Sequence, residues 1–229
     1  MTNWSSIKAI AFDLDGTLID SVPDLAAATN ATLQQMDLAS VTTAQVRSWV
    51  GNGAKVLMQR ALAHVQPEMT KSAEFDVLVE QTMPSFMQQY GLHLEKHSEL
   101  YPNVLATLSH LKLAGYQMAV VTNKPYEFTI PLLNSFGLSH FFDIVLGGDS
   151  LEKMKPDPMP LNHLLSQWQL ASSQLLMVGD SKNDILAAKS AKVAAIGLTY
   201  GYNYGEHISL SSPQAVCDDF AQIGDLLLN

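Results

Sequence analysis

The chain after residue 100 alternates between two kinds of apolar pattern. Where apolar residues recur every three or four positions we predict helices, and where short apolar runs are bounded by turn residues we predict strands. The helices expected are 103–114, 126–136, 158–168, 183–191 and 219–228, and the strands expected are 116–122, 143–146, 174–178, 193–198 and 215–217. Such alternation is typical of an α/β fold, in which a parallel sheet carries helices on both faces.

An earlier apolar run, within residues 7–17, leads directly into two acidic side chains. Asp13 and Asp15 end this run and Gly16 breaks it. The strand must join the predicted sheet, and open α/β sheets bind their ligands at the carboxyl ends of the strands. Asp13 and Asp15 are therefore candidates for chemistry. The alternatives are a solvated turn and a calcium loop, but the chain lacks the Gly and the Glu that a calcium loop needs at fixed positions.

Residues 21–90 show helical patterns only. Pro23 stands at a suitable first helical position, residues 54–65 are strongly helical, and residues 75–90 are helical with an expected kink at Pro84. We therefore predict a small helical domain at 21–90, inserted into a core domain that consists of 1–20 and 91–229.

Composition and charge narrow the function classes. The chain has 229 residues, a 47% hydrophobic content and a formal net charge of −9. This charge argues against a nucleic-acid partner, which requires a basic surface, but it is compatible with a small anionic substrate in a locally cationic pocket. The single cysteine, Cys217, excludes an internal disulfide and a cysteine-rich metal site.

The first residues lack the basic and apolar succession of a targeting segment. No run approaches the roughly 18 uninterrupted apolar residues of a membrane-spanning helix. We expect a cytoplasmic enzyme without a membrane partner, either a monomer or a homodimer.

Three more polar motifs follow predicted strands. They are Thr122-Asn123-Lys124-Pro125, Lys153-Met154-Lys155-Pro156 and Gly179-Asp180-Ser181-Lys182-Asn183-Asp184. In a parallel sheet these motifs converge on the edge that carries the two acids of the first strand. Each motif also has a structural alternative. The first could be a turn that ends its strand, the lysine of the second could be an ordinary exposed side chain, and the third could be a helix-capping box.

Together, the four motifs resemble those of the haloacid dehalogenase superfamily of phosphatases, in type, order and position across nearly the whole chain. The resemblance implies a Rossmann-like core with a small helical cap inserted after the first motif. It also implies that Asp13 attacks phosphorus and forms an aspartyl-phosphate, and that Asp15 acts as general acid and base. Thr122 and Asn123, with Gly16, would bind the phosphoryl group, and Lys155 would balance the negative charge.

The same resemblance implies Mg²⁺, bound by the Asp13 carboxylate, the Asp15 backbone carbonyl, Asp180 and Asp184. Mg²⁺ prefers hard oxygen ligands, and a cation is needed where an anionic nucleophile approaches a phosphate. As an acid, Asp15 must carry a proton at neutral pH, so we expect other acids to crowd it and raise its pKa.

The presence of Asp15 separates the chain from the dehalogenases of the superfamily, and a lid favours compact substrates. Within the superfamily the chain is most similar to the bacterial phosphoglycolate phosphatases, above all in the segment 197–206. This similarity implies hydrolysis of 2-phosphoglycolate. A phosphosugar mutase, a phosphatase for another small ester or pyrophosphate, and a non-enzymatic binding protein are the alternatives.

Two features of the substrate site stay open in the sequence. Gly51, Asn52 and Gly53 are either a cap loop that meets the phosphoryl site or a turn that connects helices. A carboxylate at the far end of the substrate needs a cation or amide donors, for which the candidates are Arg47, Lys55, Lys124 and Lys182.

Overall fold

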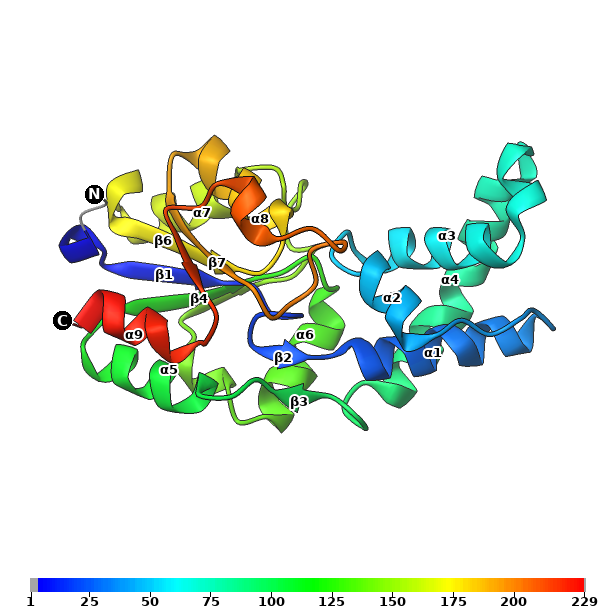
Figure 1. Cartoon of the computed structure of the whole chain (residues 1–229), viewed down its shortest axis with the longest axis horizontal. Coiled ribbons are helices and arrows are strands. Elements are labelled where there is room, and N and C mark those ends of the chain that lie inside the picture. The colour runs from blue at the N-terminus through cyan, green and yellow to red at the C-terminus, as the bar shows by residue number, and fades with distance from the viewer. Residues whose placement is uncertain (1–3, 229) are drawn as a thin grey trace.

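A six-stranded parallel sheet forms the centre of the larger part of the molecule (Figure 1), in a computed structural model that describes residues 4–228. Across the sheet the strands are β5 (Ile144–Leu146), β4 (Gln117–Val121), β1 (Ala9–Phe12), β6 (Leu175–Gly179), β7 (Ala194–Leu198) and β8 (Ala215–Cys217). The order places β4 and β5 on one side of β1 and β6 to β8 on the other. The predicted parallel sheet is confirmed.

Helices cover both faces of this sheet. They are α5 (Val104–Leu113), α6 (Tyr126–Ser135), α7 (Met159–Trp168), α8 (Lys182–Ala191) and α9 (Ala221–Leu228). In Figure 1, α7 and α8 lie above the strands and α5 and α9 lie below them. The central strand β1 shows why both faces are covered: Ile10 and Phe12 pack into one apolar cluster, and Ala9 and Ala11 pack into the other. Side chains of a strand alternate between faces, so a strand that is apolar at every position requires two covered faces.

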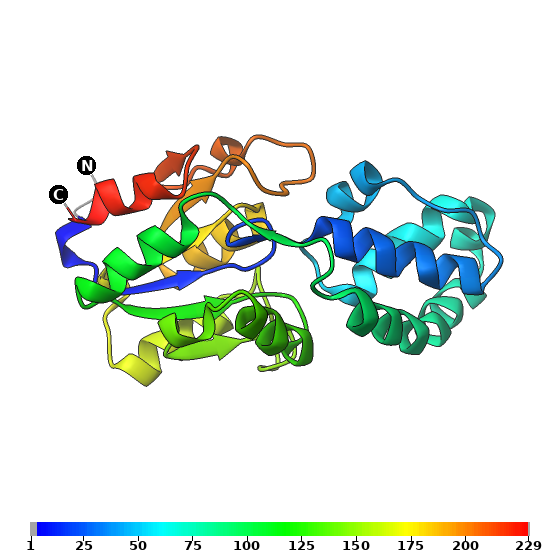
Figure 2. The ribbon, with the colours of Figure 1, turned by 90° about the horizontal axis from the view of Figure 1, so that it is seen from below.

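Four helices stand apart from the sheet, on the right of Figure 1 and of Figure 2. They are α1 (Val22–Gln35), α2 (Thr43–Trp49), α3 (Ala54–Val65) and α4 (Glu74–His93), and together we call them the cap helices. The two linkers that join them to the sheet pair as antiparallel strands, β2 (Ile19–Asp20) and β3 (Glu99–Leu100). The cap boundaries 21 and 90 stay a prediction, since α4 continues to His93.

The elements observed after residue 100 lie within two residues of those expected from the apolar pattern, whereas α4 ends three residues beyond the expected 75–90. Pro84 and Pro131 both lie inside continuous helices, α4 and α6. The pattern did not predict β2 and β3, because two-residue strands are too short to show a period. It also missed five short 3₁₀ helices, at Trp4–Ser6, Pro67–Lys71, Ser139–Phe141, Ser172–Gln174 and Ile208–Ser211. None of the helices in residues 4–228 has the length and apolar character needed to cross a bilayer.

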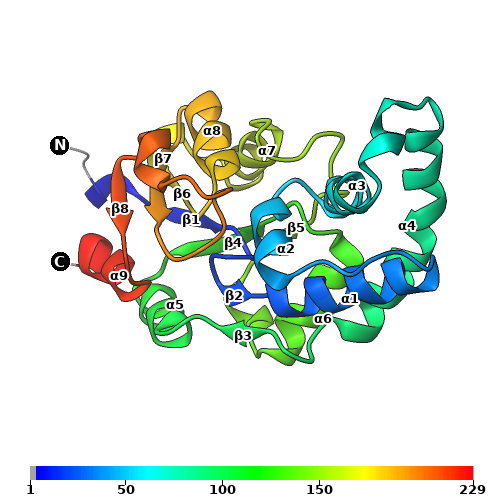
Figure 3. The same cartoon turned by 45° about the vertical axis from the view of Figure 1, so that its right-hand side comes forward.

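Three polar residues follow the three central strands directly. Asp13 follows β1, Thr122 follows β4 and Asp180 follows β6. The chain leaves β1 toward β4 on one side and later adds β6 on the other, so these residues lie at the point where the strand order reverses. Ligands of open α/β sheets bind at such a point. The cap helices lie beside the same edge of the sheet, as the turned view in Figure 3 shows.

Candidate active site

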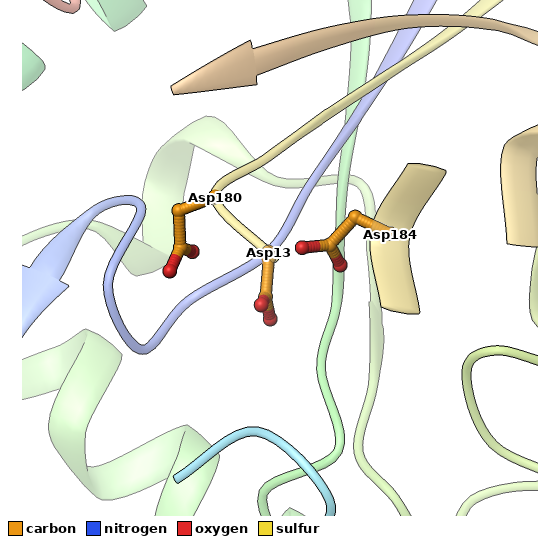
Figure 4. A group of neighbouring side chains, drawn as sticks. All are labelled: Asp13, Asp180 and Asp184. Carbon is orange, nitrogen blue, oxygen red and sulfur yellow. The ribbon is translucent and has the colours of Figure 1, made fainter. Parts of the chain in front are cut away.

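Asp13, Asp180 and Asp184 bring their carboxylates together at this edge (Figure 4). Oxygen atoms of the three side chains lie within 4.8 Å of one another, and all three residues are buried. Asp184 comes from the first turn of α8, and its carboxylate points toward the other two. The sequence predicted that these residues would meet, and the fold places them together because two adjacent parallel strands end there.

Asp13 is held by two donors on the same oxygen. Its Oδ1 accepts a hydrogen bond from the backbone N–H of Leu14 at 2.7 Å, and it lies 2.9 Å from the ammonium of Lys155. Burial raises the pKa of Asp13 to about 7; Lys155 lowers this pKa, whereas Asp184 and Asp15 raise it. No described residue donates a hydrogen bond to Asp13 Oδ2. This second oxygen is therefore available to a ligand.

Lys155 links the cluster through a second carboxylate. Its ammonium donates to Asp184 Oδ1 at 2.6 Å, and its side chain is almost fully buried. Burial alone would lower the pKa of Lys155, but Asp13 and Asp184 raise it above its ordinary value. Lys155 is thus a permanent cation among buried acids, and not the exposed lysine that the sequence left as an alternative.

The other oxygen of Asp184 accepts from the backbone N–H and the hydroxyl of Ser181, each at 2.9 Å. The predicted capping box is present. It coexists with the carboxylate cluster because Oδ2 of Asp184 accepts from Ser181 while Oδ1 accepts from Lys155. Asp180 accepts from the Thr17 hydroxyl and from the Tyr202 N–H, both at 2.6 Å. Burial, Asp13 and Asp184 hold the pKa of Asp180 well above its usual range.

Asp15 has a different environment from the one expected. Its Oδ1 accepts from the Ser21 hydroxyl at 2.5 Å and from the Lys124 ammonium at 2.7 Å. The direct partners of Asp15 are therefore a hydroxyl and a cation, whereas the closest cluster of acids forms around Asp13.

Gly16 lies against Asp180 and not in the cavity wall. Its φ is +88°, and a Cβ atom added to it would lie 2.3 Å from Asp180 Oδ2. A residue with a side chain would therefore be strained and would displace the carboxylate. The predicted site residue Gly16 thus serves the close approach of the first loop to Asp180.

A cavity of about 40 Å³ opens above Asp13 and Asp15. Its floor includes Thr122, Asn123 and Lys124 from the loop after β4. The cap helices and their connecting loop also line it, through Leu25, Val50, Gly51, Gly53, Ala54, Leu57 and Tyr90. A space of this size holds only a few water-sized groups.

The loop Gly51–Asn52–Gly53 lies between two cap helices and forms hydrogen bonds with the domain that contains the six-stranded sheet. The Gly51 carbonyl accepts from the side-chain amides of Asn123 and Asn183, each at 2.9 Å. Asn52 Oδ1 accepts from the Tyr204 hydroxyl at 2.8 Å, and Gly53 lines the cavity. The cap loop therefore contacts the residues that follow β4 and β6, and the cap is in a closed position.

Of the four cations that the sequence analysis considered for the carboxylate of the substrate, three have other partners in the structure. Arg47 pairs with Asp20 at 3.0 Å, Lys55 pairs with Glu80 on the surface, and Lys182 lies 3.6 Å from Glu206. None of these three lines the cavity, whereas Lys124 does.

Several site residues were not selected from the sequence. Ser21, Tyr90, Asn183 and Tyr204 all contact the site or line its cavity. Asn183 belongs to a motif that the sequence showed, so its position gave a signal. Tyr90 gave none, because an apolar helical pattern identifies a buried face but not what that face meets.

The carboxylate cluster fits a magnesium ion. Three buried acids share one ammonium among the described residues, so the carboxylates outnumber the cation that pairs with them. Burial, together with the neighbouring acids, raises the pKa of Asp13 and of Asp180, which is unfavourable for their ionised forms unless a further cation is present. Hard carboxylate oxygens without histidine or cysteine suit Mg²⁺. The Asp15 backbone carbonyl as a further ligand stays a prediction.

Comparison with known proteins agrees with the resemblance that the sequence motifs showed. The family model described as "Haloacid dehalogenase-like hydrolase" matches residues 10–198. The phosphoglycolate phosphatase of Vibrio cholerae serotype O1 is 50% identical over 226 residues, which are 97% of this chain and 98% of the relative. The phosphoglycolate phosphatase of Pasteurella multocida is 47% identical over 223 residues, 97% of this chain and 99% of the relative.

A solved structure is similar over the same extent. The crystal structure of a protein from Haemophilus somnus, described as a predicted phosphoglycolate phosphatase, matches with a TM-score of 0.91 and 44% identity. The match covers 98% of this chain and 99% of that one. The similarity therefore includes both the sheet and the cap helices.

Proposed function

We propose that this chain, which belongs to the haloacid dehalogenase-like hydrolase family, is a magnesium-dependent phosphatase that converts 2-phosphoglycolate to glycolate and phosphate. One observation carries the proposal: the Asp13 carboxylate, which belongs to a cluster of buried acids and pairs with the buried cation Lys155, lines a small cavity at the edge of the sheet. This arrangement suits transfer of a phosphoryl group to a side chain.

Asp13 is the nucleophile in this proposal. Lys155 and the Leu14 N–H fix its Oδ1, so its Oδ2 is free to form the bond to phosphorus. The P–O bond to the alcohol breaks as the bond to Asp13 forms, which gives an aspartyl-phosphate and an alkoxide. Water then attacks the phosphorus and releases phosphate and the free carboxylate.

Asp15 is the general acid of the first step and the general base of the second. It gives a proton to the departing alkoxide and takes one from the attacking water. Hydrogen bonds from Ser21 and Lys124 hold its carboxylate in a fixed orientation near Asp13. Such positioning is what a group that acts twice in one cycle requires.

Thr122 and Asn123, which follow β4 and line the cavity, would bind the phosphoryl oxygens. Asp13, Asp180 and Asp184 would hold Mg²⁺, which neutralises charge on the phosphoryl group when bound. Lys155 supplies the second positive charge, and because it pairs with both Asp13 and Asp184 it holds these two side chains in place.

The size of the cavity and the names of the relatives support a short substrate. The cap loop reaches Asn123, and the cavity beside the acids has a volume of only about 40 Å³, which favours a compact substrate over a polymer or a folded protein. The relatives from Vibrio cholerae and Pasteurella multocida are phosphoglycolate phosphatases. A cytoplasmic setting and a monomeric or dimeric state remain predictions.

The test is a phosphate-release panel with the purified full chain and Mg²⁺. We expect kcat/KM for 2-phosphoglycolate to exceed that for sugar phosphates, nucleotides and pyrophosphate. Release must not depend on an added sugar bisphosphate, since such dependence indicates a mutase. Phosphate release from none of the esters at any Mg²⁺ concentration would contradict the proposal.

A further inference from the structure

The cap helices contribute one hydrogen-bonding side chain to the cavity wall, that of Tyr90. The ring of Tyr90 lies against Phe86 and Phe128, with ring centres 5.7 and 4.6 Å apart. Its hydroxyl is buried and has no hydrogen-bond partner among the described residues, and the whole residue is only 2% exposed.

An unpartnered buried hydroxyl is unfavourable for the folded protein. Burial without a partner costs on the order of 1–3 kcal/mol, and a phenylalanine would fill the same space without that cost. Tyr90 is one of the residues that line the cavity, so a ligand bound there could supply the missing partner. The other side chains of the cap wall are apolar, so they offer the ligand nothing but contact area.

Lys124, which follows β4, offers further donors beside Tyr90. Its side chain is 1% exposed, and its ammonium lies 4.9 Å from the centre of the Tyr90 ring. The ammonium has three N–H groups, and among the described residues it has one hydrogen-bond acceptor, Asp15. It is also the only cation that lines the cavity within residues 4–228.

We propose, resting on the phosphatase function above, that Tyr90 and Lys124 bind the end of the substrate that carries no phosphate, and that this end is a carboxylate. A carboxylate accepts hydrogen bonds from a phenol and an ammonium at once. The two residues come from the cap and from the sheet part, so this contact exists only while the cap is closed.

Selectivity follows from what happens when the carboxylate is missing. An ester with an apolar end leaves a buried hydroxyl and two ammonium donors unpaired in a closed space. Sites built to hydrogen-bond one substrate group reject the analogue that lacks it far more strongly than an apolar pocket does. Tyr90 is therefore a specificity-determining residue.

The experiment compares 2-phosphoglycolate, 2-hydroxyethyl phosphate and ethyl phosphate in wild type, Tyr90→Phe and Tyr116→Phe. Tyr116 is the matched control, since its hydroxyl donates to the Leu227 carbonyl at 3.0 Å and it does not line the cavity. Wild type should favour 2-phosphoglycolate over both other esters.

Tyr90→Phe should lower kcat/KM for 2-phosphoglycolate by roughly 10- to 100-fold, the range for a hydrogen bond to a charged group. The loss should lie mainly in KM and should be at least about tenfold smaller for ethyl phosphate, which has no acceptor at that end. Tyr116→Phe should keep the ratio of the two esters within about twofold, because it changes only a distant hydrogen bond.

Thermal unfolding without ligand gives a second measurement. Tyr90→Phe should keep or raise the Tm, since it removes a hydroxyl that has no partner, whereas Tyr116→Phe should lower it. An equal loss of kcat/KM for all three esters, or a clear fall in the Tm of Tyr90→Phe, overturns the inference. So does a wild type that hydrolyses the three esters equally well. That last result leaves the phosphatase function intact, while a wild type inactive on all three contradicts the function itself.

Discussion

The hydroxyl of Tyr204 donates to the side-chain oxygen of Asn52 at 2.8 Å, and so ties a loop after β7 to the cap loop. The same hydroxyl accepts from the Asn183 amide at 2.9 Å. Arg60 of the cap donates to Asn52 Oδ1 at 2.9 Å and lies over the Tyr204 ring. One tyrosine thus connects a motif at the sheet edge with the closed position of the cap.

Loss of this connection should weaken closure. Tyr204→Phe removes the hydrogen bond to Asn52, which joins the cap to the sheet domain, and the one from Asn183, and we expect kcat/KM for the substrate to fall about 3- to 20-fold. The measurement is steady-state phosphate release, with Tyr116→Phe as the control that loses a hydroxyl far from the cap. A Tyr204→Phe enzyme with unaltered kcat/KM would show that closure does not depend on this contact.

Asp13→Asn should abolish turnover, because the amide cannot form the acyl-phosphate. We expect kcat to fall by at least about 10⁴-fold, as for other enzymes that lose their nucleophile. The Tm of the metal-free protein should stay equal or rise, since one buried acid of an anionic cluster is removed. Residual activity within tenfold of wild type rejects Asp13 as nucleophile.

Asp15→Asn tests the proton transfers separately from the attack. Loss of general acid and base catalysis should reduce kcat by about 10²- to 10⁴-fold. With ³²P-labelled substrate and rapid acid quenching, label should be found on the wild-type polypeptide. It should be absent from Asp13→Asn. A wild-type rate in Asp15→Asn excludes the double role.

The raised pKa of Asp13 predicts how the metal-free protein responds to pH. The folded state holds this proton up to about pH 7, whereas the unfolded chain loses it near its ordinary value of 3.8. Because the folded state binds more protons in that window, the free energy of unfolding should fall as pH rises from about 4 to about 7 through this group. Asp180, whose pKa is also raised, acts in the same direction.

Mg²⁺ should oppose this loss, since it favours the ionised carboxylates. The increase in Tm on adding Mg²⁺ should therefore be larger at pH 7.5 than at pH 5.5. Thermal scans with and without EDTA measure this difference. An increase independent of pH would mean that Mg²⁺ does not bind at the carboxylate cluster.

Lys155→Met should destabilise the fold strongly. The change leaves Asp13 and Asp184 buried without their common cation, and removing one partner of a buried ion pair costs about 3–5 kcal/mol. Urea unfolding of the metal-free protein measures the loss. Lys153→Met is the matched control, because Lys153 is exposed and pairs with Asp157 at 3.5 Å. Equal unfolding free energies of the two variants would contradict the structural role of Lys155.

The amino-acid sequence by itself determined the sheet, its helices and the chemical character of the site. Apolar runs of strand length end at Asp13, Thr122 and Asp180, and parallel strands deliver their ends to one edge. Local patterns suffice here because strand period, helix period and turn residues are properties of neighbouring positions. The capping box at Ser181 and Asp184 was visible for the same reason.

Tertiary structure alone decided which groups share a space. It placed the ammonium of Lys124 beside Asp15. It also placed Lys124 in the cavity wall, whereas Arg47, Lys55 and Lys182 lie outside it. It also paired Ile19 with Leu100 and brought Tyr90 from the cap to the cavity wall. These contacts join residues far apart in the chain, and their geometry depends on how the cap closes on the sheet, which no local pattern encodes.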